Sequence, residues 1–482
     1  MTKTAGIIII GDEILNGSVT DTNSTFLCKR FRALGVVVQK ISTIPDDVKI
    51  LADEITLFSQ RYDIVITSGG VGPTHDDVTY ESVAAAFDVK LTTNKELKQY
   101  FDWYLCKGDV EGIRLVNIPS NAEVLYVELD EPLEGYRSNY PIVKTRNVYN
   151  FPGIPNYLEK TFMGLESTHF VNNDVQFFNR VIYLNVDEIS VASVLREVAD
   201  RFKDNVMIGS YPSTRKCDEY ATKITINSTS CDDCLNAEKE LLMKISPAML
   251  IHIPPKLPDF EFMFRLSTMN HPLSEKIRDS FRVIKECFSK YPISDTFIGF
   301  NGGKDCTVLL NLLCCYCIGN KLTNCTLTLI YFKDENSFPE LDQFIEFIKN
   351  NYKVRLIVLP TPMMQSLADY LKKRPGNLAC FLGLRSNDPR SADLKTMQET
   401  DGDWPILMRV FPILTWNYKD IWDFLRCANI PYCSLYDKGY TSLGHVNNTR
   451  VNEELKFIDE KGSIYFRPAF LLDEEKSERN GR

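Results

Sequence analysis

The stretch FIGFNGGKDCTVLL, from Phe297 to Leu310, decides the fold of the second half of this chain. A short apolar run at its start, Thr296 to Phe300, predicts a buried strand, and the apolar residues 307–313 predict a helix. Between the two lie a pair of adjacent glycines, a lysine and an aspartate. Phosphate-binding loops use this order of strand, glycine-rich turn and helix. The stretch therefore predicts an α/β domain that binds a phosphate compound.

This turn does not match the two commonest nucleotide-binding patterns. A Walker loop has a glycine five residues before its Gly-Lys pair and Ser or Thr after it, whereas this chain has Ile298 and Asp305 at those positions. The GxGxxG fingerprint of dinucleotide-binding domains is also absent. The turn must therefore bind its anion in another way.

What remains is the hexapeptide Asn301 to Cys306. Gly302 and Gly303 allow backbone N–H groups to approach an anion closely at the start of a helix. Lys304 adds a positive charge, and Asp305 suits a Mg²⁺ ion that bridges the protein to a polyphosphate. The residues alone leave one alternative open, a tight turn in which Asp305 only caps the helix.

The hexapeptide resembles the PP-loop of enzymes that cleave ATP between its α and β phosphates. Together with four further stretches, it resembles the eukaryotic FAD synthase (FMN adenylyltransferase) family over roughly Phe281 to Arg482. Asn301 and Cys306 replace the two serines of the general loop, as they do in that family. Ser386 departs from the family, because a second arginine is expected beside Arg385. The four stretches are SFPELDQF (337–344), FLGLRSNDPR (381–390), DWPILMRVFPILTWNYKDIWDFLRCANIPYCSLYDKGYTSLG (403–444) and ERNGR (478–482).

The resemblance implies that the FMN phosphate attacks the α-phosphorus of ATP in line, so that FAD and pyrophosphate form. Two polyanions must meet in such a reaction, so the protein must chiefly position and neutralise them. By resemblance, FAD would then pass to apo-flavoproteins. We expect catalytic roles for Lys304, Asp305, Arg479 and Arg482, ATP binding by Asn301, Gly302, Gly303, Lys304, Cys306 and Arg409, flavin binding by Arg385, Asp388 and Trp404, and Mg²⁺ binding by Asp305.

Other candidates in this region are interpreted more conservatively. His445 is predicted to be a loop residue, not a base. Trp416 and Trp422 could form a ring platform for the isoalloxazine, as Trp404 could. Trp422 lies at helical spacing within YKDIWDFL, so we expect it to pack in the core.

A second double-glycine turn, SGGVGPTHDDVTYES (68–82), follows the predicted strand DIVIT. Its glycines, Gly69, Gly70 and Gly72, could expose backbone donors to an anion, while Asp76 and Asp77 could hold a divalent metal or cap the helix. With IIGDEILNGSVTDTNS (9–24) and NFPGIPNYLEKTF (150–162), it is similar to the molybdopterin-binding domain family, most closely the branch of the bacterial competence-damage-inducible proteins. In animal fusion enzymes, the resemblance implies metal-dependent hydrolysis of FAD. A non-catalytic pterin- or flavin-binding scaffold is the alternative.

The chain as a whole is predicted to hold two doubly wound α/β domains, one molybdopterin-binding-like and one of the PP-loop adenine-nucleotide hydrolase type, with a small α+β module between them. We place these at residues 1–165, 266–482 and 174–253. The module shows a strand–helix–strand–helix pattern without visible chemistry, so a spacer role is favoured. IPPKLPDFEF (253–262) is predicted to be a linker because it has three prolines and no periodicity.

Composition excludes several classes of function. The 482 residues carry a net charge of −9, which argues against a general electrostatic grip on nucleic acid or an anionic membrane. No apolar run is long enough to span a bilayer. The chain has 14 cysteines but no secretory leader, which favours a reduced, cytoplasmic protein. Cys231 and Cys234 form a lone CxxC pair without a nearby histidine in sequence, so a zinc site is not expected.

Two rival enzymes share the PP-loop. A sulfonucleotide reductase would need a redox cysteine near its C-terminus, and no cysteine follows Cys433. A tRNA-thiolating enzyme would need paired CxxC motifs and a basic surface, which the charge of −9 does not favour.

Overall fold

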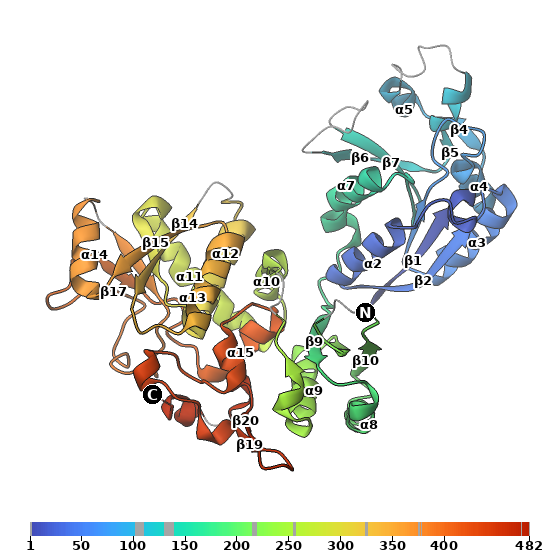
Figure 1. The fold of residues 1–482 in the computed structure, drawn as a ribbon. Coiled ribbons are helices and arrows are strands. Elements are labelled where there is room, and N and C mark those ends of the chain that lie inside the picture. Colours follow the sequence, from blue (N-terminus) through green and yellow to red (C-terminus); the bar gives the residue numbers. More distant parts are fainter. Residues whose placement is uncertain are drawn as a thin grey trace. The chain divides into compact units, whose positions relative to one another are not determined.

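The computed structural model describes residues 2–101, 110–129, 139–214, 219–253, 257–322, 326–374, 376, 378–473 and 475–481. The chain divides into two compact units, residues 1–177 and 178–482 (Figure 1). The predicted small module therefore shares a unit with the PP-loop part. No helix in the described part of the chain has the length and apolar character needed to cross a bilayer.

The first unit is built on a six-stranded sheet in the order β2-β1-β3-β8-β7-β6. The first four of these strands are parallel, and β7 and β6 continue the sheet antiparallel. The strands are β1 (Lys3–Ile10), β2 (Val36–Ile44), β3 (Ile64–Ser68), β6 (Glu123–Glu128), β7 (Asn139–Thr145) and β8 (Val148–Phe151). The helices are α1 (Asp12–Leu15), α2 (Asn23–Ala33), α3 (Val48–Arg61), α4 (Thr79–Ala86), α5 (Lys95–Tyr100) and α7 (Pro155–Leu165), and a two-stranded sheet joins β4 (Leu91–Thr93) to β5 (Asn117–Pro119).

Strand β1 shows why this unit is doubly wound. Its isoleucines alternate between two cores because successive side chains of a strand point to opposite faces. Ile7 and Ile9 pack with residues of α2 and α7, whereas Ile8 and Ile10 pack with residues of α3 and α4. Figure 1 shows the two pairs of helices on opposite faces of the sheet. The predicted α/β fold is confirmed.

The second unit begins with an antiparallel sheet in the order β10-β11-β9-β12. The strands are β9 (Phe178–Leu184), β10 (Val206–Pro212), β11 (Thr222–Ser228) and β12 (Leu250–Ile251), and the helices are α8 (Ala192–Arg201) and α9 (Cys231–Lys244). The strand–helix–strand–helix prediction missed β10 and β12. In β10, Met207 and Tyr211 are exposed, so the strand lies at the sheet edge and lacks a clear apolar alternation.

The PP-loop part has a sheet in the order β15-β14-β13-β16-β18-β17, parallel except for β17. Its strands are β13 (Thr296–Gly299), β14 (Leu327–Lys333), β15 (Val354–Pro360), β16 (Ala379–Leu382), β17 (Met397–Glu399) and β18 (Met408–Val410). Its helices are α10 (Phe260–Leu266), α11 (Pro272–Lys290), α12 (Lys304–Gly319), α13 (Pro339–Asn351), α14 (Met363–Lys372) and α15 (Tyr418–Cys427). The tail holds the short strands β19 (Lys456–Ile458) and β20 (Ile464–Phe466) and ends in a 3-10 helix, η10 (Glu475–Arg479).

The strand order of the PP-loop sheet marks where a ligand can bind. The strand order reverses at β13, which has β14 on one side and β16 on the other, and open α/β sheets bind ligands at such a point beyond the strands' carboxyl ends.

The linker was predicted to extend to residue 262, but helix α10 already begins at Phe260, so its predicted end was wrong. Asp259 accepts a hydrogen bond from Phe262 N (2.9 Å) and so starts helix α10 at Phe260. Residues 254–256 lie outside the described residues.

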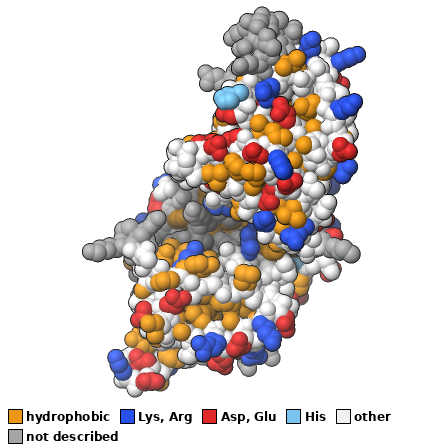
Figure 2. Space-filling view, turned by 90° about the vertical axis from the view of Figure 1, so that its right-hand side faces the viewer, with side chains coloured by type: hydrophobic (Ala, Val, Ile, Leu, Met, Phe, Trp, Pro, Cys, Tyr) orange, Lys and Arg blue, Asp and Glu red, His pale blue; other side chains and the backbone are white. Residues whose placement is uncertain are grey.

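Charged side chains of both signs are interspersed on the face drawn in Figure 2, with orange hydrophobic side chains between them. Most of the described cysteines are buried, among them Cys306, Cys315 and Cys317 along α12, where a free thiol packs as a small hydrophobic group.

Candidate active site

The PP-loop joins β13 to α12 at the switch point of the sheet. Gly302 has φ = +71°, a left-handed conformation that strains any other residue, and a Cβ there would lie 2.6 Å from Leu341 Cδ1, which would have to move. Asn301 Oδ1 accepts a hydrogen bond from Gly303 N (2.9 Å), and the Tyr436 hydroxyl accepts one from Lys304 N (2.9 Å). The protein itself therefore satisfies two of the loop N–H groups that we expected to face an anion.

Lys304 and Arg385 form the centre of a buried charge cluster, with side chains only 2 % and 1 % exposed. Glu478 bridges them: its Oε1 lies 2.5 Å from Lys304 Nζ, and both of its oxygens lie 2.8 Å from Arg385 Nη2. Asp305 completes the ring, 3.3 Å from Lys304 Nζ and 3.0 Å from Arg385 Nε. The predicted phosphate-binding cations are thus held together by carboxylates.

Asp388 supports the same cluster from the loop after β16. Its Oδ1 lies 3.1 Å from Arg385 Nη2 and 3.0 Å from Arg479 Nη2, and its Oδ2 accepts the backbone N–H of Arg385 (2.8 Å). Asp388, which was predicted to contact the flavin, therefore binds Arg385 and Arg479 in this structure. Arg479 reaches the cluster through Asp388, while its catalytic role stays a prediction, and Arg482 lies outside the described residues.

The carboxylates control the electrostatics of this cluster. Burial alone would lower the pKa of Arg385, but Asp305, Glu478 and Asp388 raise that pKa above its ordinary value. Burial would likewise raise the pKa of Asp388, yet Arg385 and Arg479 hold it below its ordinary value. Arg385 Nη1 is buried and has no hydrogen-bond acceptor among the described residues. An unused donor in a buried arginine fork is suited to a phosphate oxygen.

Gly383 brings the end of β16 against the start of α12. A Cβ at this position would lie 2.9 Å from Cys306 N and from Asp305 C, so a side chain would push the two segments apart. Cys306 itself is buried, and burial raises the pKa of its thiol to about 11, so the neutral thiol packs beneath the loop.

Several predicted residues lie elsewhere. Arg409 pairs with Asp401 (3.0 Å) and Glu399 O (2.9 Å), and Trp404 is 41 % exposed. Neither contacts the Lys304–Arg385 cluster through any described hydrogen bond or ion pair, so their assigned ligand roles stay predictions.

The aromatic side chains correct one prediction and confirm two. Trp416 is buried and donates to the Ser280 hydroxyl (3.1 Å), so it cannot be a flavin platform. Trp422 packs in the core against Tyr432 and Tyr436, as predicted. His445 lies in a loop 3.5 Å from Asp334, also as predicted.

Sequence reasoning missed Glu478 and the tyrosines around Lys304. Lys304 Nζ lies 5.3 Å from the ring centroid of Tyr418 and 5.8 Å from that of Tyr436. Both tyrosines lie within the long stretch 403–444, and Glu478 opens ERNGR, but nothing in the sequence distinguished them from neighbouring polar residues.

The glycine turn of the first unit lines a separate pocket of about 490 Å³. Gly69 has φ = +111° and a Cβ there would meet Ile10 O at 2.1 Å, while Gly70 has φ = +60°. Asp77 Oδ2 accepts from Thr74 N (2.8 Å), so this carboxylate caps the turn. The remaining carboxylates of the pocket come from Glu13, Asp46 and Asp76, beside Gly72.

Asp46 is the carboxyl of this pocket with a raised pKa. Burial is the main cause, and the neighbouring carboxylates of Asp12, Glu13 and Asp76 add to it. A concentration of negative charge that raises a carboxyl pKa is relieved by a bound cation.

Comparisons with known proteins match three segments of the chain. Three family models match it: "Probable molybdopterin binding domain" over residues 6–166, "FAD synthase, middle domain" over 176–253, and "Phosphoadenosine phosphosulfate reductase domain" over 295–370 and 361–451. The proteins named "Probable FAD synthase" from Caenorhabditis briggsae and Caenorhabditis elegans are each 35% identical over 508 residues, which cover 100% of this chain and 96% and 97% of theirs.

The chain belongs to the FAD synthase family. The sequence resemblance and the fold class are therefore confirmed. Among solved structures, Candida glabrata FMN adenylyltransferase in complex with FAD and inorganic pyrophosphate is 28% identical, over 43% of this chain and 89% of that one, with a TM-score of 0.40. The yeast FAD synthetase in complex with FAD is 29% identical, over 45% and 91%, with a TM-score of 0.39.

The family membership also bears on the rival enzymes. The phosphosulfate reductase model covers the PP-loop part alone, whereas the two Caenorhabditis relatives, which match along the whole chain, are named "Probable FAD synthase". A sulfonucleotide reductase is therefore disfavoured.

Proposed function

We propose that the second unit transfers the adenylyl group of ATP to FMN, yielding FAD and pyrophosphate. The observation that carries this proposal is the buried Lys304–Arg385 pair at the start of α12, with Arg385 Nη1 lacking an acceptor among the described residues. FAD synthase family membership supports it. The reaction brings an FMN phosphate to the α-phosphate of ATP, and this site gathers three cationic side chains, each paired with a carboxylate, where the strand order reverses.

In this proposal, the Glu478 carboxylate is a counter-ion of Lys304 and Arg385, and a substrate phosphate would take its place. Two buried cations are costly to leave unpaired, and the Glu478 carboxylate neutralises both. A polyphosphate carries more charge than one carboxylate and can take Lys304 Nζ and the free Arg385 Nη1 together. Arg479 then approaches from the tail to hold the FMN phosphate or the leaving pyrophosphate.

Asp305 is the residue that we propose would hold Mg²⁺. It supplies a single carboxylate, which is what this ion takes when substrate phosphates and water provide its other oxygen ligands. When bound, the ion would neutralise charge on the phosphates. Asp305 now lies against Lys304 and Arg385, so phosphate binding by these cations would release its oxygens.

The test is synthesis of FAD from ATP, FMN and Mg²⁺ by the full chain, followed by chromatography. We expect Lys304→Met to lower kcat/KM by about 100-fold or more, because it removes a charge-assisted contact to the transition state. Lys349→Met is the matched control, since that lysine only pairs with Glu346 on the surface. No FAD from the wild-type chain, or an unchanged rate in Lys304→Met, would contradict the proposal.

The first unit supports a second candidate function, metal-dependent hydrolysis of the FAD pyrophosphate. The supporting observation is the pocket in which Gly69 and Gly70 face Glu13, Asp46 and Asp76. We expect Asp76→Ala combined with Asp77→Ala to abolish FAD hydrolysis and to leave FAD synthesis unchanged. If FAD is bound but not cleaved by the wild-type chain with any divalent metal, the scaffold alternative holds instead.

We further propose that the FAD product is delivered to apo-flavoproteins and that the protein acts in the cytoplasm. The free thiols of the described cysteines suit a reducing compartment.

A further inference from the structure

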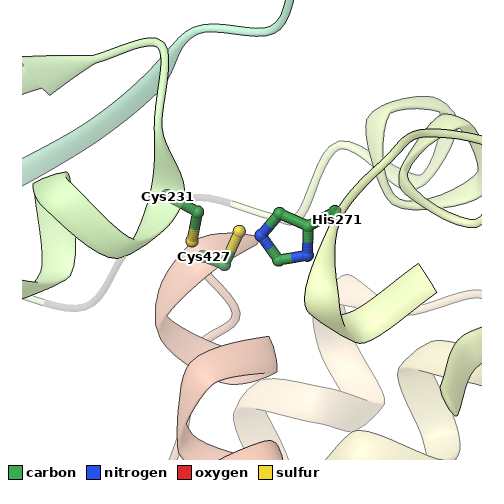
Figure 3. A group of neighbouring side chains, drawn as sticks. All are labelled: Cys231, His271 and Cys427. Carbon is green, nitrogen blue, oxygen red and sulfur yellow. The ribbon is translucent and has the colours of Figure 1, made fainter. Parts of the chain in front are cut away.

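Three side chains that the proposed reaction does not use meet where the small module contacts the PP-loop part (Figure 3). Cys231 begins α9, Cys427 ends α15, and His271 precedes α11. The two sulfur atoms and a ring nitrogen all lie within 4.8 Å of one another. The sequence placed no histidine near the CxxC pair, and the fold brings one to it.

The protonation of His271 follows from its second role. His271 is the N-cap of α11, and its Nδ1 accepts the backbone N–H of Leu273 (3.1 Å). An accepting Nδ1 carries no proton, so the proton of the neutral ring lies on Nε2. Nε2 is buried, has no hydrogen-bond partner that meets full geometry among the described residues, and points toward the two thiols in Figure 3.

Cys231 differs from the neighbouring thiols. A hydrogen bond from Cys427 is the main cause that lowers its pKa to about 7; burial opposes this, His271 assists it and Asp423 opposes it weakly. The start of α9 also favours a negative charge. By contrast, burial raises the pKa of Cys234 to about 12, and its Sγ contacts Ile226 O (3.4 Å). Cys427, which burial and Cys231 hold protonated, supplies the second thiol.

A thiolate, a thiol and an imidazole could bind a metal ion, or the two sulfur atoms could form a disulfide. The hydrogen bond by which His271 caps α11 distinguishes the two. A metal on Nε2 needs that nitrogen deprotonated, with Nδ1–H donating to an acceptor, which is the reverse of the arrangement here. Structural zinc sites also use four protein ligands, and this group has three. A disulfide needs only the two sulfur atoms, and leaves the His271 cap intact.

We propose that Cys231 and Cys427 are a peroxide-oxidisable pair whose disulfide ties α9 to α15. The Cys231 thiolate attacks hydrogen peroxide, the O–O bond breaks, and a sulfenic acid and hydroxide form. The Cys427 thiol then loses its proton, its sulfur attacks the Cys231 sulfur, and water leaves. Two thiols are oxidised while one peroxide is reduced. Both residues are at least 96 % buried, so bulky disulfides cannot reach them and the oxidant of this proposal is the small molecule hydrogen peroxide.

The disulfide would reinforce a contact that the fold already makes. Glu238, one helical turn beyond Cys234 on α9, pairs with Arg180 (3.0 Å) and with Arg426, the residue beside Cys427. Helix α15 starts at Tyr418, whose ring faces Lys304. Oxidation would therefore fix the small module to the helix that supports the PP-loop lysine.

The test treats the reduced full chain with hydrogen peroxide at pH 7, blocks free thiols, and maps disulfide peptides by mass spectrometry. We expect a Cys231–Cys427 peptide and a rise in melting temperature on the order of 3 °C. Cys234→Ser is the matched control and should keep the cross-link. Cys427→Ser should leave a sulfenic acid on Cys231 that dimedone traps, and His271→Asn, which can still cap α11, should slow oxidation several-fold.

Two outcomes would overturn the proposal. One is the absence of the Cys231–Cys427 peptide from the peroxide-treated wild-type chain. The other is about one equivalent of zinc in the purified wild-type protein that is lost in Cys231→Ser and kept in Cys234→Ser, which would make the group a metal site. The wild-type measurements decide the matter even if a variant fails to fold.

Discussion

Glu478 gives Lys304 and Arg385 a role that the sequence could only half predict. Lys304 was expected to bind ATP because it follows a double glycine, and Arg385 was expected to bind the flavin substrate because of the family resemblance. That both cations bind one carboxylate from the tail depends on the tertiary fold. Glutamate in a charged tail has no pattern that distinguishes it from a solvated residue.

We therefore expect Glu478→Gln to destabilise the nucleotide-free protein by on the order of 3 kcal/mol, because it leaves a buried cation pair short of a charge. Mg·ATP should raise the melting temperature of the variant by more than that of the wild type, and KM for ATP should fall. Differential scanning fluorimetry and steady-state kinetics measure these effects. Glu346→Gln, which breaks a surface pair with Lys349, is the control. Equal melting temperatures for wild type and Glu478→Gln would refute the counter-ion role.

Asp388 should make stability depend on acid pH. Its pKa in the folded protein is lowered below 3.8, since Arg385 and Arg479 outweigh the effect of burial. Its ionised form thus stabilises the fold fully above pH 4, and this contribution is lost as the pH falls through the lowered pKa. Asp388→Asn should lower the free energy of unfolding at pH 7 and flatten its decline below pH 4, as measured by urea unfolding. The exposed Asp393→Asn should do neither.

Strand β13 was predicted to within one residue, helix α12 (Lys304–Gly319) was predicted only from its apolar residues 307–313, and the tail was not predicted. The apolar run, the glycines and the return of apolar residues after Lys304 are local signals, so propensity and tertiary context agree there. The edge strand β10, the two-residue β12 and the 3-10 turn η10 depend on long-range contacts, which leave little periodicity in the sequence. The linker prediction failed at Asp259, because its capping role was hidden among the prolines.

Gly302 and Gly462 provide a matched test of the loop. Both have positive φ, +71° and +83°, but a Cβ at Gly302 would meet Leu341 at 2.6 Å, whereas nothing lies within 4 Å of one at Gly462. Gly462→Ala should cost only the backbone penalty of about 1 kcal/mol. Gly302→Ala should cost more and should also reduce FAD synthesis at least tenfold. If chemical denaturation and activity cannot distinguish the two variants, the loop tolerates a side chain and the assignment fails.

The division of the chain into two compact units changes how the middle module is understood. Its boundaries at 174–253 remain a prediction, but a spacer would not bury Glu238 between Arg180 and Arg426. Arg180 also donates to Arg426 O (2.7 Å), so the module supplies both charge and hydrogen bonds to α15. The sequence could not reveal this, because the partners are far apart along the chain and each looks like an ordinary surface charge.

A fragment of residues 178–482 should consequently fold and make FAD at close to the full-chain rate. The shorter fragment 266–482 holds every predicted adenylyl-transfer residue, yet it leaves Arg426 without Glu238. We expect its melting temperature to be lower by several degrees, and its activity to be lost first on warming. Replacing Glu238 by Gln within 178–482 should reproduce part of the loss. Equal melting temperatures of the two fragments would show that the module does not stabilise the PP-loop part and acts only as a spacer.

The Glu478 contact also constrains the order in which the protein can mature. Lys304 lies 174 residues before its counter-ion and Arg385 lies 93 residues before it. While the ribosome is still making the residues that follow β18, the sheet and α12 can assemble, but the cation pair has no partner from the tail. A nascent chain at that stage would hold exposed positive charge that attracts polyanions, so free nucleotide or ribosomal RNA would compete for the pair until Glu478 emerges.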